Sequence, residues 1–434
     1  MLFRSGDGAA ALPPNPGFIL TGELDEFSWD DWKRYVPANA ASAPADGSAP
    51  SSSGALLPAS VQGADLMVGN FQAFGQSMDD LHLVLTRAAD GWQARLDSAS
   101  VAGTLSLPST VDAAHPLKLD MDRLLLTKPP QASPAAGSTP AAVAANPSPR
   151  YDPRRIPALQ FTGKRLEYGE LKLGSASFSL KPLQDGVALE DLKVDADSFG
   201  ITGDGTWTTT PAGTQRSALN MDVKSRDVGK SLQALGYAPA ITGSKGEVNA
   251  ALNWQDSPFG DLVHTLDGTI YVKLQDGQIV DVQPGAGRVF GLLSLNALPR
   301  RILLNFSDVF SKGFGYDTIE GDFTLQNGDA YTKDMQVKGP AAKISLVGRT
   351  GLAKRDFDEA LIVDANVGST LPVVGALAAG VGVGAVVFLL TEIFKKPLTA
   401  AGQSQYHLTG TWDNPVLTKQ GAVPATPSKN SGNP

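Results

Sequence analysis

The side chains best suited to metal chemistry are scattered along this chain. Its four histidines lie far apart in the sequence, and no two of them have the short spacing typical of metal ligands: His82, His115, His264 and His407. Cysteine is absent, which excludes zinc–thiolate sites, iron–sulfur clusters and thiolate catalysis. The sequence therefore predicts no metal site and no cofactor.

A cluster of carboxylates is the other group that could do chemistry. The stretch "DFDEALIVDAN" places four acids close together, which suggests a cation site or paired carboxylates: Asp356, Asp358, Glu359 and Asp364. The simpler interpretation, which we favour, is a charged turn before a strand over residues 360–365. No histidine accompanies the acids, so the sequence predicts no catalytic pair.

Phosphate-binding and nucleophile motifs are also missing. The stretch Gly285–Gly291 is rich in glycine but lacks the G-x-G-x-x-G spacing, and neither a P-loop nor a G-x-S-x-G elbow occurs. The chain carries 36 Lys and Arg against 44 Asp and Glu, without a basic block. This balance argues against a nucleic-acid partner. We therefore expect a protein that is not an enzyme.

The dominant pattern is an alternation of apolar and polar residues with a period of two, which is typical of strands with one apolar face. It recurs in Val248–Trp254 and in the runs that we expect to line a common apolar surface. These candidate lining residues are Leu117, Leu119, Met121, Leu219, Met221, Val223, Ile270, Val272, Leu274, Ile344 and Leu346.

Turn dipeptides separate the alternating runs. They are Asp90-Gly91, Asp185-Gly186, Asp267-Gly268, Asp276-Gly277 and Asn327-Gly328, and they suit tight hairpins. A weak repeat relates residues 74–107 to residues 168–207, with a third copy near Gly321. These signals predict a mainly β protein with a long, twisted antiparallel sheet.

Helical signals are few. Short helices are predicted over residues 28–36, with Ser28 as the N-cap, over residues 230–235, and over residues 287–298 before Pro299. Stretches rich in Ala, Pro and Ser at residues 38–55, 129–153 and 421–434 read as flexible loops or a disordered tail.

The segment 371–397 differs from the rest, because no residue from Leu371 to Leu390 is charged. A spanning helix, a buried helix pair and a hairpin that meets a membrane are the alternatives. Glycines at 380, 382 and 384 would break it into arms too short to cross a bilayer, which favours the hairpin. The expected membrane-contacting residues are Leu371, Val374, Leu377, Val383, Val387, Phe388, Leu389 and Phe394.

Several motifs resemble the YhdP branch of the AsmA-like proteins. They are G-x-G-R-x-x-G-L-L-S at Gly285–Ser294, L-P-R-R at Leu298–Arg301, F-S-D-x-F-x-K-G-F at Phe306–Phe314, G-D-F at Gly321–Phe323, V-G-R-T-G at Val347–Gly351 and the closing Tyr406–Leu417. The resemblance implies a sheet curled into an apolar groove that carries phospholipid between the inner and outer membranes of a Gram-negative envelope. It also implies an N-terminal inner-membrane helix, which this chain lacks, and support of the outer-membrane permeability barrier.

These signals together predict an organisation and a function. The predicted parts are a groove segment at 1–128, a loop at 129–153, a repeat segment at 154–242, an AsmA-like region at 243–370, the hairpin at 371–397, a final strand at 398–420 and the tail.

The expected function is that of the distal part of a lipid bridge, with phospholipid acyl chains as partners, membrane contact at the C-terminal end and a further protein partner in the periplasm or outer membrane. The alternative is a structural or adhesive β-solenoid that binds other proteins.

Overall fold

The computed structural model describes residues 17–32, 61–73, 75–127, 151–237, 240–260, 262–280, 314–364 and 403–420, with Val386, Val387, Leu390 and Ile393. Twenty strands in these ranges form one open, mixed sheet, accompanied by a few short helices. The predicted fold class is confirmed. The strands are β1 Phe18–Ser28, β2 Val61–Ala73, β3 Gln76–Ala88, β4 Gly91–Asp97, β5 Val101–Pro108, β6 Leu117–Leu126, β7 Leu159–Tyr168, β8 Leu171–Pro182, β9 Gly186–Asp195, β10 Phe199–Thr209, β11 Gln215–Ser225, β12 Ile241–Thr242, β13 Lys245–Gln255, β14 Asp267–Ile279, β15 Phe314–Gln326, β16 Asp329–Lys338, β17 Lys343–Gly351, β18 Asp356–Asp364, β19 Gln403–Thr411 and β20 Pro415–Gln420.

The chain forms two compact units, which are described separately. Unit 1 comprises Met1–Val223, Ala234–Gly236 and Gln255–Gly260. Unit 2 comprises Lys224–Gln233, Tyr237–Trp254 and Asp261–Pro434.

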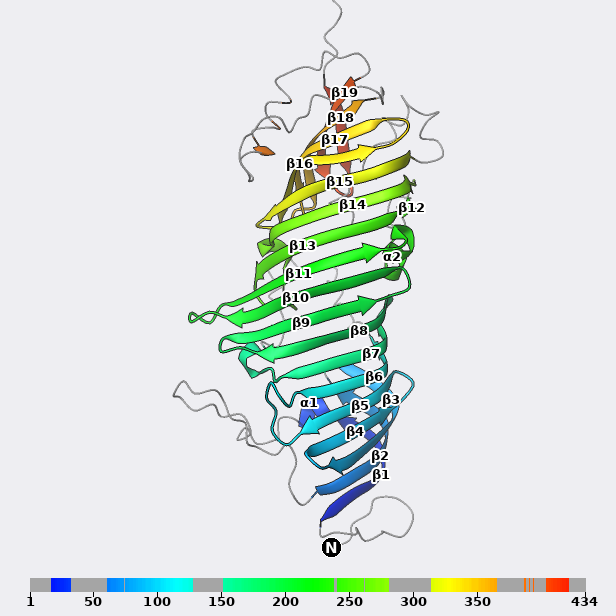
Figure 1. Ribbon diagram of the computed structural model, residues 1–434, viewed down its shortest axis with the longest axis vertical. Coiled ribbons are helices and arrows are strands. Elements are labelled where there is room, and N and C mark those ends of the chain that lie inside the picture. Colours follow the sequence, from blue (N-terminus) through cyan, green and yellow to red (C-terminus); the bar gives the residue numbers. More distant parts are fainter. Residues whose placement is uncertain are drawn as a thin grey trace, which may run out of the picture. The chain divides into compact units, whose positions relative to one another are not determined.

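In unit 1, successive strands lie side by side in chain order (Figure 1). Antiparallel pairs connect β2 through β6 and β7 through β10. The pairs β1–β2 and β6–β7 are parallel, so the prediction of a fully antiparallel sheet is wrong at these two places. A parallel pair needs a connection that returns over the full strand length. Both connections coincide with the Ala-, Pro- and Ser-rich stretches of the sequence.

In unit 2, antiparallel pairs connect β13 through β20 without interruption. The short β12 pairs with the far end of β14, beyond the part of β14 that pairs with β13. Figure 1 shows β13 through β17 of this unit as successive neighbours.

Three of the five predicted hairpin turns are confirmed. Asp90-Gly91 joins β3 to β4, Asp185-Gly186 joins β8 to β9, and Asn327-Gly328 joins β15 to β16. Asp267-Gly268 and Asp276-Gly277 lie within β14, so their prediction as turns is wrong. Asp276 has a positive φ of 53°, and it marks the point where the neighbour of β14 changes from β13 to β12.

The repeat noted in the sequence corresponds to two similar three-stranded meanders. Strands β3 to β5 and strands β8 to β10 each contain an Asp-Gly turn, followed by a second short turn. That second turn is closed by the bond from Ser98 N to Val101 O in one copy and from Ala196 N to Phe199 O in the other.

The two predicted short helices within the described ranges are present. Helix α1 covers Trp29–Trp32, and the Ser28 hydroxyl accepts a hydrogen bond from Asp31 N at 3.2 Å, as expected of an N-cap. Helix α2 covers Val228–Ala234 and begins two residues before the prediction. The helix predicted at 287–298, the loop at 38–55, most of the loop at 129–153 and the tail lie outside the described residues.

The closing segment forms two strands where one was predicted. Strand β19 ends at Thr411, and β20 begins at Pro415, which pairs with Gly410. Proline is tolerated as the first residue of an edge strand, because no ladder hydrogen bond needs its missing N–H there.

Gly174 should be more sensitive to substitution than Gly213, although both have positive φ angles, +67° and +83°. A Cβ at Gly174 would lie 2.3 Å from the carbonyl oxygen of Asp195 on the neighbouring strand, whereas a Cβ at Gly213 would meet nothing within 4 Å. We expect Gly174→Ala to cost about 1–3 kcal/mol more unfolding free energy than Gly213→Ala. Urea unfolding of the two variants checks this difference, and equal midpoints would contradict it.

Candidate functional site

In unit 1 the register brings apolar side chains from neighbouring strands onto one face of the sheet, here called the apolar face. One row of partners across six strands is Leu66, Leu83, Leu96, Gly103, Met121 and Gly163, and a second row is Ala64, Leu85, Ala94, Leu105, Leu119 and Phe161. Successive side chains of a strand point to opposite faces. The alternation in the sequence and the register between strands therefore produce one continuous apolar surface.

The centre of this surface is a packed cluster. Val101, Met121, Phe161 and Ala176 are buried, and partly buried side chains such as Leu105 pack around them. The rings of Phe161 and Phe178 stack with centroids 5.0 Å apart. Most of the other members are only half-buried, so the apolar face of unit 1 is packed along its middle and accessible elsewhere.

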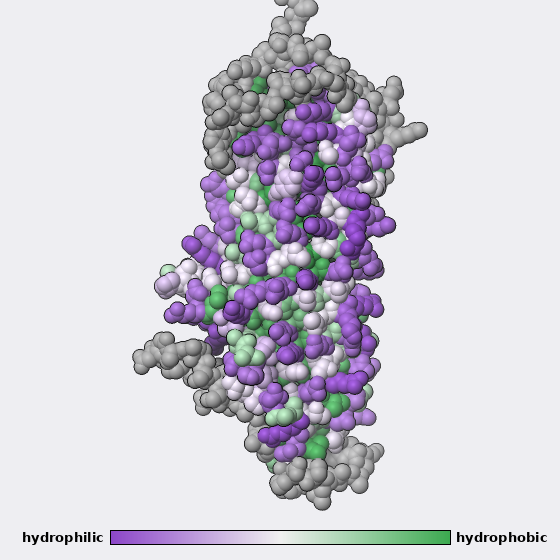
Figure 2. All heavy atoms as spheres, viewed as in Figure 1, coloured by the Kyte–Doolittle hydropathy of each residue, from purple (hydrophilic) through white to green (hydrophobic). Residues whose placement is uncertain are grey.

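The opposite face of unit 1 is polar. One row of partners there is Asp65, Val84, Arg95, Thr104, Asp120 and Thr162, and Thr162 donates a short hydrogen bond to Asp120. Lys164 bonds Asp122 at 2.7 Å on the same pair of strands. Figure 2 shows hydrophilic residues over much of the visible surface, with smaller hydrophobic patches between them.

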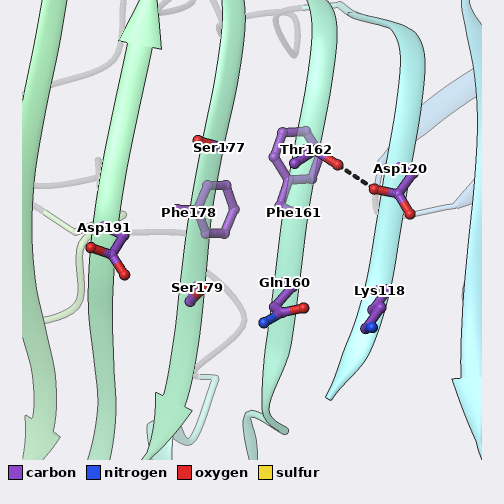
Figure 3. A pocket seen from close by; sticks show the side chains of 9 residues that line it. All are labelled: Lys118, Asp120, Gln160, Phe161, Thr162, Ser177, Phe178, Ser179 and Asp191. Atoms are coloured by element: carbon purple, nitrogen blue, oxygen red, sulfur yellow. Dashed lines mark hydrogen bonds between the residues drawn. The ribbon is translucent and has the colours of Figure 1, made fainter. Parts of the chain in front are cut away.

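A shallow depression lies mainly on this polar face, although two members of the apolar face, Phe161 and Phe178, also line it. Figure 3 shows its side chains, which come from β6 to β9: Lys118, Asp120, Gln160, Phe161, Thr162, Ser177, Phe178, Ser179 and Asp191. Most of them are the polar partners that alternate with the apolar rows. The depression therefore offers hydrogen-bonding groups beside apolar area, to which Phe161 and Phe178 contribute.

Unit 2 has an apolar face built in the same way. One row of partners is Leu274, Ile319, Val337, Ile344 and Val363, and these side chains are at most 4% exposed. Neighbouring members are buried as well: Val272, Phe323, Leu346, Leu361 and Leu408. The apolar face of unit 2 is therefore much more enclosed than that of unit 1.

The structure places the predicted lining residues on these apolar faces. Leu117, Leu119 and Met121 belong to the face of unit 1. Leu219 and Met221 lie beside Gly205 and Gly203 of the same face, and Val223 follows them in alternation. Ile270, Val272, Leu274, Ile344 and Leu346 share the face of unit 2. Whether they contact lipid remains a prediction.

Several central members of the two faces were missed by the sequence analysis. They are Phe161, Phe178, Ile319, Phe323, Leu361 and Leu408. The same period of two could have found Phe161 and Phe178, which alternate with hydroxyl and amide residues in β7 and β8.

Glu359 is the acid that departs most from expectation. It was assigned to a charged turn, but β18 already begins at Asp356, so that interpretation is wrong. Within the strand, Asp356 and Asp358 occupy the polar face, while Glu359 falls on the apolar face between Gly348 and Leu408. It is 1% exposed.

The carboxyl of Glu359 has a single hydrogen-bond partner among the described residues. Thr350 donates a short bond to Oε1, whereas Oε2 is buried without any partner, as is the hydroxyl of nearby Thr332. Burial raises the pKa of Glu359 to about 7, against the smaller opposing effects of the Thr350 bond and the charge of Arg349. A carboxyl of this kind titrates near neutral pH.

The positive charge that acts on Glu359 is that of Arg349, and it is fully engaged on the other face. Arg349 donates to Asp329 at 2.9 Å and to both oxygens of Asp356 at 2.9 and 3.0 Å. These bonds raise the pKa of the Arg349 guanidinium. His407 likewise lies 2.8 Å from Asp358 on that face. Glu359 therefore lacks a cationic partner among the described residues.

Two described residues of the apolar segment pack on this polar side of unit 2. Val386 is buried against Val347, and Ile393 joins the cluster with Tyr331. Gln405 also donates to the carbonyl of Ile393 at 3.0 Å. Val347 alternates with Leu346, so these contacts are on the face opposite Leu346 and Ile344.

Of the eight predicted hairpin residues, Val387 alone is described; it is helical and 53% exposed. The other seven, Leu371, Val374, Leu377, Val383, Phe388, Leu389 and Phe394, lie outside the described residues. In the described ranges no helix is both long and apolar enough to cross a membrane, and no three potential metal ligands cluster.

Glu359→Gln should stabilise the protein above neutral pH. Because the pKa of Glu359 rises from 4.5 to about 7 on folding, the folded state holds a proton between these values that the unfolded chain has lost. Wild-type stability therefore falls as pH rises through this window, by on the order of 3 kcal/mol. Glutamine carries no charge and escapes this loss.

Urea unfolding at pH 5 and pH 8 measures the effect. The variant should be more stable than the wild type at pH 8 and differ little at pH 5. Glu247→Gln, the same change on the polar face opposite Lys273, is the control. An equal effect of Glu359→Gln at both pH values would contradict the assignment.

Comparison with known proteins identifies a family. A family model described as "YhdP protein" matches residues 2–417. The intermembrane phospholipid transporter YhdP of Escherichia coli (strain K12) is 26% identical over 348 residues. That match covers 79% of this chain and 27% of the transporter, so the chain spans about a quarter of that relative's length. No solved structure matches. The family match extends over nearly the whole chain, and the chain therefore belongs to the YhdP family.

Proposed function

We propose that this chain is part of a bridge-like lipid transporter and that phospholipid acyl chains lie along its apolar face. The observation that carries the proposal is the continuous one-sided apolar surface of unit 1, whose side chains remain half-accessible. An ordinary core would enclose such side chains. Contact with acyl chains would remove them from water at a gain of about 25 cal/mol per Å².

The dimensions of this face suit an acyl chain. Along β7, apolar positions extend from Leu159 to Leu166, which corresponds to about 23 Å at 3.3 Å per residue. One leaflet of a bilayer has a hydrocarbon thickness of about 15 Å, half of the ~30 Å core. A fatty-acid chain can therefore lie along the strands without reaching the polar ends.

Membership of this family supports the proposed lipid transport. The E. coli relative is named an intermembrane phospholipid transporter. By analogy we place the chain in a Gram-negative envelope, as the distal part of a conduit between the inner and outer membranes that supports the permeability barrier. The sheet would form the groove, and residues 371–397 would meet a membrane at its C-terminal end. The adhesive solenoid remains the competing function, in which the polar face binds proteins and the apolar face binds no lipid.

Neighbouring residues on opposite faces provide a direct test. A photo-crosslinking amino acid at Leu119 should capture phospholipid in cells, whereas the same probe at Lys118 should not, because adjacent side chains point to opposite faces. Mass spectrometry of the crosslinked, purified protein gives the readout. Protein adducts at Lys118 with no lipid at Leu119 would favour the adhesive function and overturn the conduit.

A charge on the apolar face should block lipid binding. Leu105→Glu places a carboxylate among Ala94 and Leu119, where acyl chains would have to desolvate it, so we expect several-fold less co-purified lipid. Thr104→Glu is the matched control, because its side chain lies on the polar face beside Arg95. Lipid extraction from both folded variants measures the difference. Equal lipid content would contradict the proposal.

A further inference from the structure

A small polar site interrupts the apolar face of unit 2. Glu359, Thr350 and Thr332 lie around Gly348, on three neighbouring strands whose other side chains on this face are mostly aliphatic or aromatic. All three polar side chains are at most 2% exposed. The site lies on the enclosed apolar face of unit 2. The inference below rests on the proposed function and extends its acyl-chain surface from unit 1 to this face.

Two atoms of this site have no hydrogen-bond partner among the residues that the structure describes. Oε2 of Glu359 and the hydroxyl of Thr332 are buried and unbonded, and the register places both residues opposite Gly348. An unmet hydrogen bond of a buried polar group is costly, and more so for a charged one. A ligand that enters from the apolar side could therefore supply the bonds that these two atoms lack.

Gly348 is the residue of β17 that lies between them. A Cβ at this position would lie 2.3 Å from the Asp358 carbonyl oxygen and 2.5 Å from the Glu359 Cα, so no side chain fits there. Thr332 and Glu359 stand on the strands either side of β17, about 9.6 Å apart as two strand spacings. A small polar group would reach both residues only once the surrounding apolar side chains part.

The chemistry of the site selects the ligand. A carboxylate without a cationic partner attracts a positively charged group that can donate hydrogen bonds, and a threonine hydroxyl can accept one of them. A phosphate or a second carboxylate would be repelled. A primary ammonium has three N–H donors and one positive charge. We propose that Glu359 and Thr332 bind the primary ammonium of a phospholipid head group during its passage along the apolar face.

The experiment compares three phospholipids with identical acyl chains. Vesicles hold equal amounts of phosphatidylethanolamine, phosphatidylcholine and phosphatidylglycerol, and the lipids on the re-purified full chain are quantified by mass spectrometry. Phosphatidylcholine keeps the positive charge without N–H donors, and phosphatidylglycerol lacks the charge. We expect roughly tenfold enrichment of phosphatidylethanolamine over phosphatidylcholine, as one charge-assisted hydrogen bond would give.

Variants connect this preference to the site. Glu359→Gln should reduce the enrichment to about one, and the control Glu247→Gln on the polar face should leave it as in the wild type. Thr332→Val keeps the side-chain shape, removes the hydroxyl and should lower the enrichment by a smaller factor. If the unfolding curve of Glu359→Gln shows that this variant does not fold, Thr332→Val provides the test instead.

The possible results separate the two proposals. Bound lipid without any head-group preference, or a preference that Glu359→Gln retains, overturns the ammonium site and leaves the conduit standing. No bound lipid of any class overturns the conduit itself. A further arm adds free ethanolamine to lipid-free protein. If it raises the melting temperature of the wild type but not of Glu359→Gln, the site takes a soluble amine, and the head-group assignment is wrong.

Discussion

The whole structure depends on keeping the registers of neighbouring strands in step. A slip of one residue in any pair would turn the apolar side chains of that strand to the polar face. The β-bulges in the sheet preserve this register. In β6 and β7 the residues around the bulges are charged, Asp122-Arg123 and Lys164-Arg165. The apolar sequence resumes at Leu124 and Leu166 on the original face. The bulges bend the strands while the apolar face stays continuous.

The same alternation leads to different environments in the two units. In unit 1 the apolar face has a buried centre around Phe161 and accessible side chains around it. In unit 2 its members, such as Ile319 and Leu408, are completely buried. Burial of this kind stabilises unit 2 as a folded body, whereas the accessible area in unit 1 is free to contact another apolar molecule. The same alternation thus builds an enclosed face in unit 2 and leaves an accessible apolar surface on unit 1.

The sequence predicted the elements whose signals are local. Alternation placed Leu119 and Leu274 on apolar faces, Asn327-Gly328 marked a two-residue hairpin, and Ser28 capped α1. It failed where the partner strand decides. The parallel pairs at β1–β2 and β6–β7 carry no local mark, and Asp276-Gly277 looks like a turn although two neighbours hold it within β14. The predicted hairpin lies mostly outside the described residues and stays a prediction.

The position of Glu359 also depends on tertiary context. Strand β18 is buried on both faces along its second half, with Leu361 and Val363 on the apolar side and Ala360 and Ile362 on the other. The sequence of a strand that is buried on both faces is typically a continuous apolar run, and Glu359 directly precedes such a run. Its placement was obscured because three further acids stand nearby in the sequence.

Folding alone does not account for this carboxyl. An aliphatic side chain of similar size at position 359 would pack against Leu408 without desolvating a charge or leaving Oε2 unbonded. Thr350 satisfies only one oxygen, and Arg349 is turned to the polar face by Asp329 and Asp356. The local structure therefore gives no compensation for the second oxygen. The proposed head-group ammonium, arriving from the apolar side, would supply the missing bond.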